Sequence, residues 1–184
     1  MISGHPDHRN APDRRTRSGG FTLVELIAVL VVVSILAAVS VPTLSSLGDT
    51  RASMAARHLA RDLSFARQRA VATGTRTWVL FDTAAESWEI LGEDPDNPGR
   101  ANATALTDLA TGEDFAQTLG TGSFAGVQVV SAAFDGDVQV GFDWLGRALN
   151  ATETLLAARG TVTLSGSHVV NVEATTGFVS HVGP

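Results

Sequence analysis

The 184-residue sequence contains no cysteine. Disulfide bonds, thiolate metal sites and cysteine nucleophiles are therefore excluded, and a domain exported to an oxidising compartment would depend on packing alone. Lysine is also absent, so arginine supplies all thirteen basic residues. The length allows one modest domain and an anchor, and the 44% apolar content predicts that most of the chain folds.

Positive charge is scarce beyond the first twenty residues. Residues 1–20 hold four arginines and two acids (+2), whereas residues 21–184 hold nine arginines and seventeen acids (−8). Nucleic acids and anionic lipids are bound nonspecifically through clustered cations. The acidic charge of residues 21–184 therefore makes nucleic acid an unexpected partner.

One long apolar run, FTLVELIAVLVVVSILAAVSV, covers residues 21–41 and is followed by Pro42. As a helix with a rise of about 1.5 Å per residue it spans roughly 31 Å, which matches a hydrocarbon core of about 30 Å. Arg14, Arg15 and Arg17 precede the run, and the positive-inside tendency places them in the cytoplasm. The run is therefore predicted to cross the membrane once, with the C-terminal domain on the far side.

An acidic side chain interrupts this apolar run. Glu25 lies at its fifth position, where a carboxylate costs on the order of 2–3 kcal/mol in lipid and needs a partner. If a peptidase cut after Gly20, the new α-amino group of Phe21 would be mostly cationic and one helical turn away. Glu25 can then face the amine of its own chain or that of an adjacent subunit.

Residues 20–26 read GFTLVEL, which resembles the processing and assembly motif of the type IV prepilin superfamily. The resemblance implies that residues 1–20 are a leader and that a prepilin peptidase cuts after Gly20 and methylates Phe21. It also implies that Glu25 pairs with the N-terminus of a neighbouring subunit. Residues 21–42 then form the transmembrane and assembly helix, with a kink at Pro42.

Two other N-terminal segments share part of this pattern. A conventional signal peptide has a basic start and an apolar core, and residues 38–40 (AVS) fit a small-x-small cleavage site. Its core usually covers about 7–15 residues, whereas this run is longer and contains Glu25. An ordinary anchor explains the length of the run but neither Glu25 nor the glycines at positions 19 and 20. The prepilin interpretation is therefore preferred.

An amphipathic continuation of the helix is predicted over residues 43–74. Its apolar stripe comprises Met54, Ala55, Ala56, Leu59, Leu63, Ala66 and Ala70. Gly74 suits a C-terminal cap, and Asp49 suits the cap of a helix that restarts after Gly48. The charged residues that lie mostly away from the stripe are Arg57, Arg61, Asp62, Arg67 and Arg69. Two interpretations of these arginines stay open: a solvated face, or a surface that meets acidic neighbours in a filament.

From residue 75 onward the apolar residues recur every second position, which predicts a β-rich head over residues 75–184. Strands are expected at 75–82, 87–91, 127–134, 138–143, 160–164, 168–173 and 178–181, with residues 135–137 joining the third strand to the fourth. Residues 92–123 are predicted to form a long loop with a short helix near 104–110. Short turns favour antiparallel pairing. The predicted fold class is α+β and pilin-like, a long N-terminal helix packed on an antiparallel β-rich head.

Near the end of the head, Phe142 precedes the pair Gly146-Arg147, and Gly177 follows the last paired strands. This arrangement is similar to the closing pattern of the GspH/FimT pseudopilin family. In that family a phenylalanine, a turn and a Gly-Arg pair precede paired strands and a final glycine turn. The resemblance implies a minor pseudopilin of a type II secretion pseudopilus, or alternatively a minor pilin of a type IV pilus that serves assembly or DNA uptake. The implied partners are other pilins or pseudopilins, the prepilin peptidase and the inner-membrane assembly platform. Some members carry a basic residue after the final glycine, in a patch linked to DNA uptake, whereas Phe178 occupies that position here.

Candidate catalytic and metal-binding groups are sparse. Two histidines lie in the leader, and His58, His168 and His181 are isolated in the sequence without metal-ligand spacing. The oxygen-rich segments 93–97 and 135–137 are interpreted as a solvated loop and a hairpin turn rather than calcium sites. The sequence therefore predicts a structural subunit without enzymatic activity, cofactor or metal. The rival hypothesis is a membrane-anchored periplasmic binding domain formed by residues 76–184.

Overall fold

The computed structural model describes residues 21–109 and 111–184, and the side chains of residues 38–46 lie outside this description. The predicted leader, with Gly20, lies outside the described residues. The chain divides into two compact units, residues 1–41 and 42–184. Helix α1 (Leu23–Thr73) contains the boundary between them. The division into a leader, a membrane helix over 21–42, its continuation over 43–74 and a head stays a prediction.

The first unit contains the N-terminal part of α1, which begins at a side-chain cap. Thr22 Oγ1 accepts a hydrogen bond from the backbone N–H of Glu25 at 3.2 Å, and the Thr22 carbonyl accepts one from Leu26 at 3.1 Å. Every residue from 21 to 37 is exposed. Apolar side chains therefore cover all faces of this helix without a packing partner among the described residues.

A search of the described residues for membrane spans gave no helix with the length and apolar character that crossing a bilayer requires.

In the second unit, one face of α1 is buried. This face comprises Ala52, Ala55, Ala56, Leu59, Leu63, Ala66 and Ala70, which confirms the predicted stripe from Ala55 onward. Met54 does not belong to it, because its side chain is 47% exposed. The cap at Gly74 is confirmed: its φ is +71°, and its N–H bonds to the Ala70 carbonyl at 3.0 Å. The predicted restart at Gly48 is wrong, because α1 continues through it.

Two antiparallel sheets complete the second unit. The first contains β1 (Thr77–Asp82), β2 (Ser87–Gly92), β3 (Thr104–Ala105), β4 (Ala116–Thr118), β6 (Gln139–Phe142) and β7 (Ala148–Leu149) in the order β3-β2-β1-β6-β7, with β4 also paired to β2. The second contains β5 (Val129–Ala133), β8 (Gly160–Leu164), β9 (His168–Val172) and β10 (Val179–Val182) in the order β10-β9-β8-β5. Three 3₁₀ turns, η1 (Arg100–Asn102), η2 (Gly122–Phe124) and η3 (Ser165–Ser167), lie in the connections.

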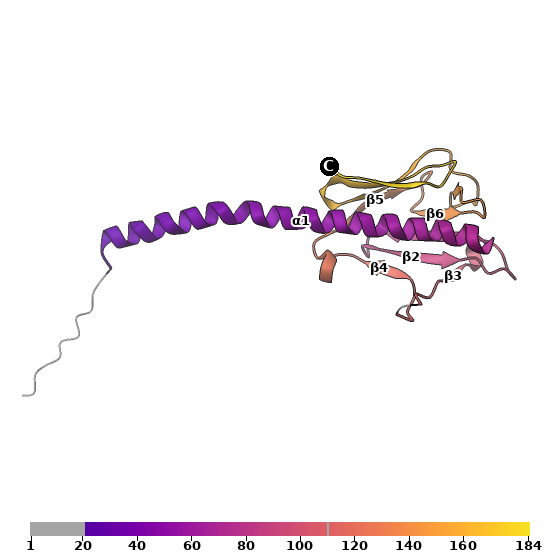
Figure 1. Cartoon of the computed structure of the whole chain (residues 1–184), viewed down its shortest axis with the longest axis horizontal. Coiled ribbons are helices and arrows are strands. Elements are labelled where there is room, and N and C mark those ends of the chain that lie inside the picture. Colours follow the sequence, from indigo (N-terminus) through magenta and orange to yellow (C-terminus); the bar gives the residue numbers. More distant parts are fainter. Residues whose placement is uncertain (1–20, 110) are drawn as a thin grey trace, which may run out of the picture. The chain divides into compact units, whose positions relative to one another are not determined.

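The magenta part of α1 runs across both sheets (Figure 1). Their inner faces and the buried face of α1 enclose one apolar core. Its fully buried strand residues include Val79, Ile90, Val140 and Phe142 from the first sheet, and Val162, Leu164 and Val170 from the second. Burial of each such side chain contributes about 1.5–3 kcal/mol, so this core fixes α1 against the head.

The predicted long loop at 92–123 contains more structure than expected. The short helix predicted near 104–110 is wrong, because Thr104 and Ala105 form β3 and pair with the end of β2. Residues 116–118 form β4, which pairs with the other half of β2. Without β3 and β4, the outer backbone groups of β2 would lack partners, and such groups are costly to leave unpaired. Two- and three-residue strands give no periodicity that the sequence could reveal.

The hairpin predicted across residues 135–137 is also wrong. Phe134 and Asp137 exchange two backbone hydrogen bonds, at 3.0 and 3.1 Å, but the flanking strands do not pair with each other. Instead β5 pairs with β8 in the second sheet, and β6 pairs with β1 in the first. The chain therefore passes from one sheet to the other at this turn.

Candidate functional site

The predicted assembly residues lie at the exposed start of α1. The Phe21 side chain is 81% exposed, and Glu25 is exposed in the first turn of the helix. The Glu25 carboxylate makes no hydrogen bond or ion pair with any residue in the described ranges 21–109 and 111–184. Its backbone N–H is held by Thr22. Among the described residues, the carboxylate therefore has no partner that would compete with a cation from another subunit.

Thr22 is a helix-capping residue that the sequence analysis did not identify. The spacing Thr22-x-x-Glu25 is the signature of an N-terminal capping box, so the signal was available. The cap fixes the start of α1 at the residue after Phe21. The processing role of Gly20, the methylation of Phe21, the pairing of Glu25 and the kink at Pro42 all stay predictions. Pro42 lies within α1, but its side chain is outside the described part.

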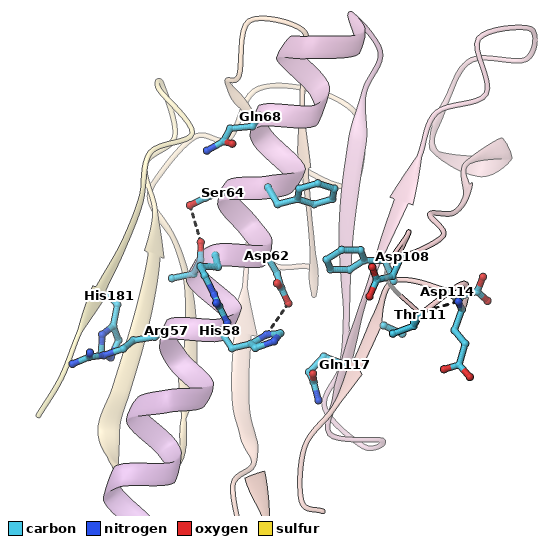
Figure 2. A pocket seen from close by; sticks show the side chains of 16 residues that line it. Arg57, His58, Asp62, Ser64, Gln68, Asp108, Thr111, Asp114, Gln117 and His181 are labelled. Carbon is cyan, nitrogen blue, oxygen red and sulfur yellow. Dashed lines mark hydrogen bonds and ion pairs between the residues drawn. The ribbon is translucent and has the colours of Figure 1, made fainter. Parts of the chain in front are cut away.

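A groove of about 880 Å³ lies in the second unit, over the exposed face of α1. Its floor carries Arg57, Arg61, Ser64 and Gln68, which follow one another along α1. His181 of β10 lies on one side (Figure 2). The other side carries Asp108, Thr111 and Asp114, which precede β4, and Gln117 of β4. The groove therefore opens between the edges of the two sheets.

A buried carboxylate lies beneath this groove. Asp62 is only 6% exposed, and its Oδ2 accepts hydrogen bonds from Trp88 Nε1 at 2.9 Å and from His58 Nδ1 at 3.1 Å (Figure 2). The sequence analysis placed Asp62 away from the buried face, which is wrong. The reason is the indole of Trp88, a buried donor that needs an acceptor. Asp62 thus ties α1 to β2 and fixes the groove floor.

His168 and His181 form a pair, so the description of them as isolated is wrong. Their rings stack with centroids 5.4 Å apart, and His168 is buried at the start of β9. Asp49 Oδ1 lies 3.1 Å from His168 Nε2, and His181 Nε2 lies 3.3 Å from His168 Nδ1. Because an ionised carboxylate can only accept, His168 Nε2 donates its N–H to Asp49 Oδ1.

The electrostatic surroundings of His181 favour its neutral form. Burial, the neighbouring His168 and the guanidinium of Arg57 lower the pKa of His181 from its ordinary value. The two histidines and Asp49 therefore join β9 and β10 to α1 through a chain of hydrogen bonds. Asp49 does this instead of capping a helix.

The Gly-Arg element of the closing pattern forms a tight turn around Asp143. Asp143 is 4% exposed, and its Oδ1 accepts the backbone N–H groups of Leu145 at 3.0 Å and Arg147 at 2.8 Å. The guanidinium of Arg147 pairs with Asp143 Oδ2 at 2.7 Å. These contacts give the turn one conformation, which the sequence pattern alone did not explain.

The final glycine turn packs directly on this Asp143 turn. A Cβ on Gly177 would lie 2.1 Å from the Gly146 carbonyl oxygen, and Gly177 has a φ of +59°. Arg67 of α1 points its Nε at both the Gly146 and the Thr176 carbonyls, each at 3.0 Å. The two glycine turns therefore pack together against α1, and hydrogen bonds to both turns hold the side chain of Arg67.

The oxygen-rich segments serve the fold. Glu93 accepts the backbone N–H groups of Arg76 at 2.8 Å and Gly99 at 3.0 Å. Asp135 accepts from the Ala157 N–H at 2.9 Å, and Asp137 from the Val138 N–H at 2.7 Å. Within the described ranges no three histidine, aspartate or glutamate residues gather in a way that could hold a metal ion.

These features define a class of protein: a pilin-like subunit, with an apolar helix that continues into the core of a small antiparallel head. The model of the prokaryotic N-terminal methylation motif matches residues 15–41. The model of the type II transport protein GspH matches residues 55–176, about two thirds of the chain. The chain belongs to the GspH family, which confirms the resemblance and the fold class inferred from the sequence.

Solved structures with the same fold include two of the minor pseudopilin EpsH from the type II secretion system of Vibrio cholerae. One matches with a TM-score of 0.53 over 73% of this chain and 96% of EpsH, the other with a TM-score of 0.54 over 74% and 98%. The sequence identity is 11% in both cases, so the similarity is one of fold. No curated protein sequence matches the chain.

Proposed function

We propose that this protein is a minor pseudopilin, a structural subunit of the short filament of a type II secretion system, and not an enzyme. The observation that supports this most directly is the combination of two matches on one chain. A prepilin methylation motif covers residues 15–41, and a GspH head covers residues 55–176. An anchored binding domain would need the head and an anchor, but not this motif.

The physical basis of assembly is the transfer of the apolar helix from lipid to a filament core. Residues 21–37 expose their side chains on every face, and apolar neighbours replace the acyl chains when helices of several subunits bundle. Glu25 would pair with the α-amino group of Phe21 of an adjoining subunit. That pairing removes the cost of an isolated carboxylate in lipid, about 2–3 kcal/mol, and sets the axial register.

Processing and topology follow the same proposal. The precursor lies in the bacterial inner membrane with residues 1–20 in the cytoplasm and the head in the periplasm. The prepilin peptidase cuts after Gly20 and methylates Phe21, and the inner-membrane assembly platform adds the mature subunit to the filament. Pro42 bends the helix where it leaves the membrane.

A role in secretion is favoured over a role in a type IV pilus that takes up DNA. Residues 21–184 carry a net charge of −8. Phe178, whose side chain is 60% exposed, follows the final glycine where a cation would be needed. A surface of this charge repels the phosphate backbone.

Deleting the gene from the source bacterium tests the secretion role. We expect exported enzymes to accumulate in the periplasm and the full-length gene to restore their release, while DNA uptake and pilus-driven motility stay unchanged. The measurement is the ratio of enzyme activity in the medium to that in the periplasm. Normal secretion together with lost motility or transformation would assign the protein to a type IV pilus instead.

A further inference from the structure

Two arginines on the groove floor differ from the other arginines of the head. Arg57 and Arg61 lie one helical turn apart, both are exposed, and neither forms an ion pair or hydrogen bond with another described residue. Most other described arginines hold a partner: Arg51, Arg67, Arg76, Arg100, Arg147 and Arg159. The groove therefore carries two positive charges that no ion pair with another described residue neutralises.

The charge of the groove is divided between its two sides. Glu113 and Asp114 lie exposed on the wall opposite β10, and no ion pair among the described residues joins them to Arg57 or Arg61. The same wall carries the half-buried Asp108, which lies near Asp114 in Figure 2. A polyanion such as DNA would meet these carboxylates as well as the arginines and would be repelled. A ligand of this groove must therefore place its negative charges next to Arg57 and Arg61 and keep them away from the acidic wall.

The shape of the groove favours an extended chain. Residues i and i+4 of a helix lie about 6 Å apart, which matches the roughly 6.6 Å between side chains i and i+2 on one face of a strand. One wall carries His181 of β10, an edge strand of the second sheet. The other includes Gln117 of β4, which among the described strands pairs with β2 alone. Backbone groups at such edges can pair with an added strand.

We propose that this groove binds an extended acidic segment of another filament subunit, with two of its carboxylates bound by Arg57 and Arg61. The identity of the partner as a filament subunit rests on the proposed function, whereas the acidic character of the segment rests on the groove. The sequence left two interpretations of the arginines on α1: a solvated face, or a surface that meets acidic neighbours in a filament. Under this proposal Arg57 and Arg61 belong to such a surface. Arg67 fits neither interpretation, because it donates hydrogen bonds to backbone carbonyls. Ser64 and Gln68 continue the floor and supply hydrogen-bonding groups to the same segment.

Site-specific photo-crosslinking in cells tests this proposal on the full-length chain. A benzoylphenylalanine placed at Gln68, which is exposed in the groove, is expected to crosslink a pilin-like subunit. Mass spectrometry of the crosslinked peptide is expected to find two acidic residues spaced as i and i+2. The double variant R57E/R61E is expected to reduce the yield about ten-fold, because it places like charges opposite each other. Reversal of the two partner acids to arginine is expected to restore it.

The matched control is Arg159→Glu, an exposed arginine outside the groove whose side chain is 57% exposed. It is expected to leave the crosslink unchanged. Processing after Gly20 and the unfolding temperature of purified R57E/R61E are expected to equal those of the wild type, which excludes misfolding. An apolar crosslinked segment, a crosslink to DNA, or an R57E/R61E yield equal to the wild type would each overturn the proposal. A crosslink to an acidic segment of a protein that is not a pilin, restored when the partner acids are changed to arginine, would support acidic-segment binding by the groove. It would contradict the role of the protein in a filament.

Discussion

Replacing Glu25 with glutamine is expected to give a protein that enters the membrane and is processed, yet is absent from the filament. The change keeps the shape of the side chain and the N-terminal cap, because Thr22 bonds to the backbone N–H of Glu25 and not to its carboxylate. It removes the one anion in an apolar run of 21 residues. The cationic amine of the neighbouring subunit would then be unpaired in lipid, at a cost of several kcal/mol.

The measurement for Glu25→Gln is the fraction of the protein in sheared filaments compared with the fraction in the inner membrane. A loss of about 3 kcal/mol corresponds to a decrease in incorporation of roughly a hundred-fold. Val29→Ala, one helical turn further along, provides the control, since it trims an exposed apolar side chain without touching charge. Filament levels of Glu25→Gln equal to those of Val29→Ala would mean that the carboxylate has no role in assembly.

The variant Gly177→Ala is expected to destabilise the head strongly. The new Cβ would lie 2.1 Å from the Gly146 carbonyl oxygen, and the φ of +59° disfavours any residue with a Cβ. The left-handed conformation costs about 1–2 kcal/mol, and forcing the two turns apart costs about 1–3 kcal/mol more. We therefore expect the free energy of unfolding to fall by about 2–5 kcal/mol, measured by denaturant unfolding of the detergent-solubilised chain.

Gly126→Ala isolates the contribution of the clash. Gly126 has a φ of +81°, but no atom lies within 4 Å of its Cβ position. We expect it to lose only about 1–2 kcal/mol, the backbone part of the Gly177 effect. Equal losses of stability in Gly177→Ala and Gly126→Ala would contradict this explanation. The close packing of the two glycine turns would then not be the reason for glycine at position 177.

Much of the fold follows from local signals in the sequence. The 3.6-residue spacing of Ala55, Leu59, Leu63, Ala66 and Ala70 predicted the buried face of α1, and the position of Gly74 predicted its end. Alternation predicted β1, β2, β6, β8, β9 and β10 to within two or three residues. These signals succeed because one face of each element packs against a single core.

The failures share a different origin, because each depends on contacts between residues far apart in sequence. Asp62 is buried because Trp88 needs an acceptor, and His168 meets Asp49 and His181 only once the second sheet lies against α1. The strands β5 and β6 lie in different sheets although the turn between them has the composition of a hairpin. No local pattern distinguishes these outcomes from the alternatives.

The same distinction between local signals and long-range contacts applies to the candidate site. The GFTLVEL motif and Glu25 are local, so the sequence alone predicted them, and the Thr22 cap could have been predicted from its spacing to Glu25. The groove could not be predicted, because α1, β10 and residues 113–117 form it and meet only in the folded head. The family's closing glycines were found as a pattern, while their physical reason is a contact between two turns.

Intact mass spectrometry of the protein from cells with and without the prepilin peptidase tests the central claim most directly. With the peptidase, the account predicts a chain of residues 21–184 that carries one methyl group on the amine of Phe21. Without it, the account predicts the full precursor with residues 1–20 attached. The same mass in both strains, or a chain that starts at Val41, would contradict the filament role and leave an anchored or secreted β-rich domain.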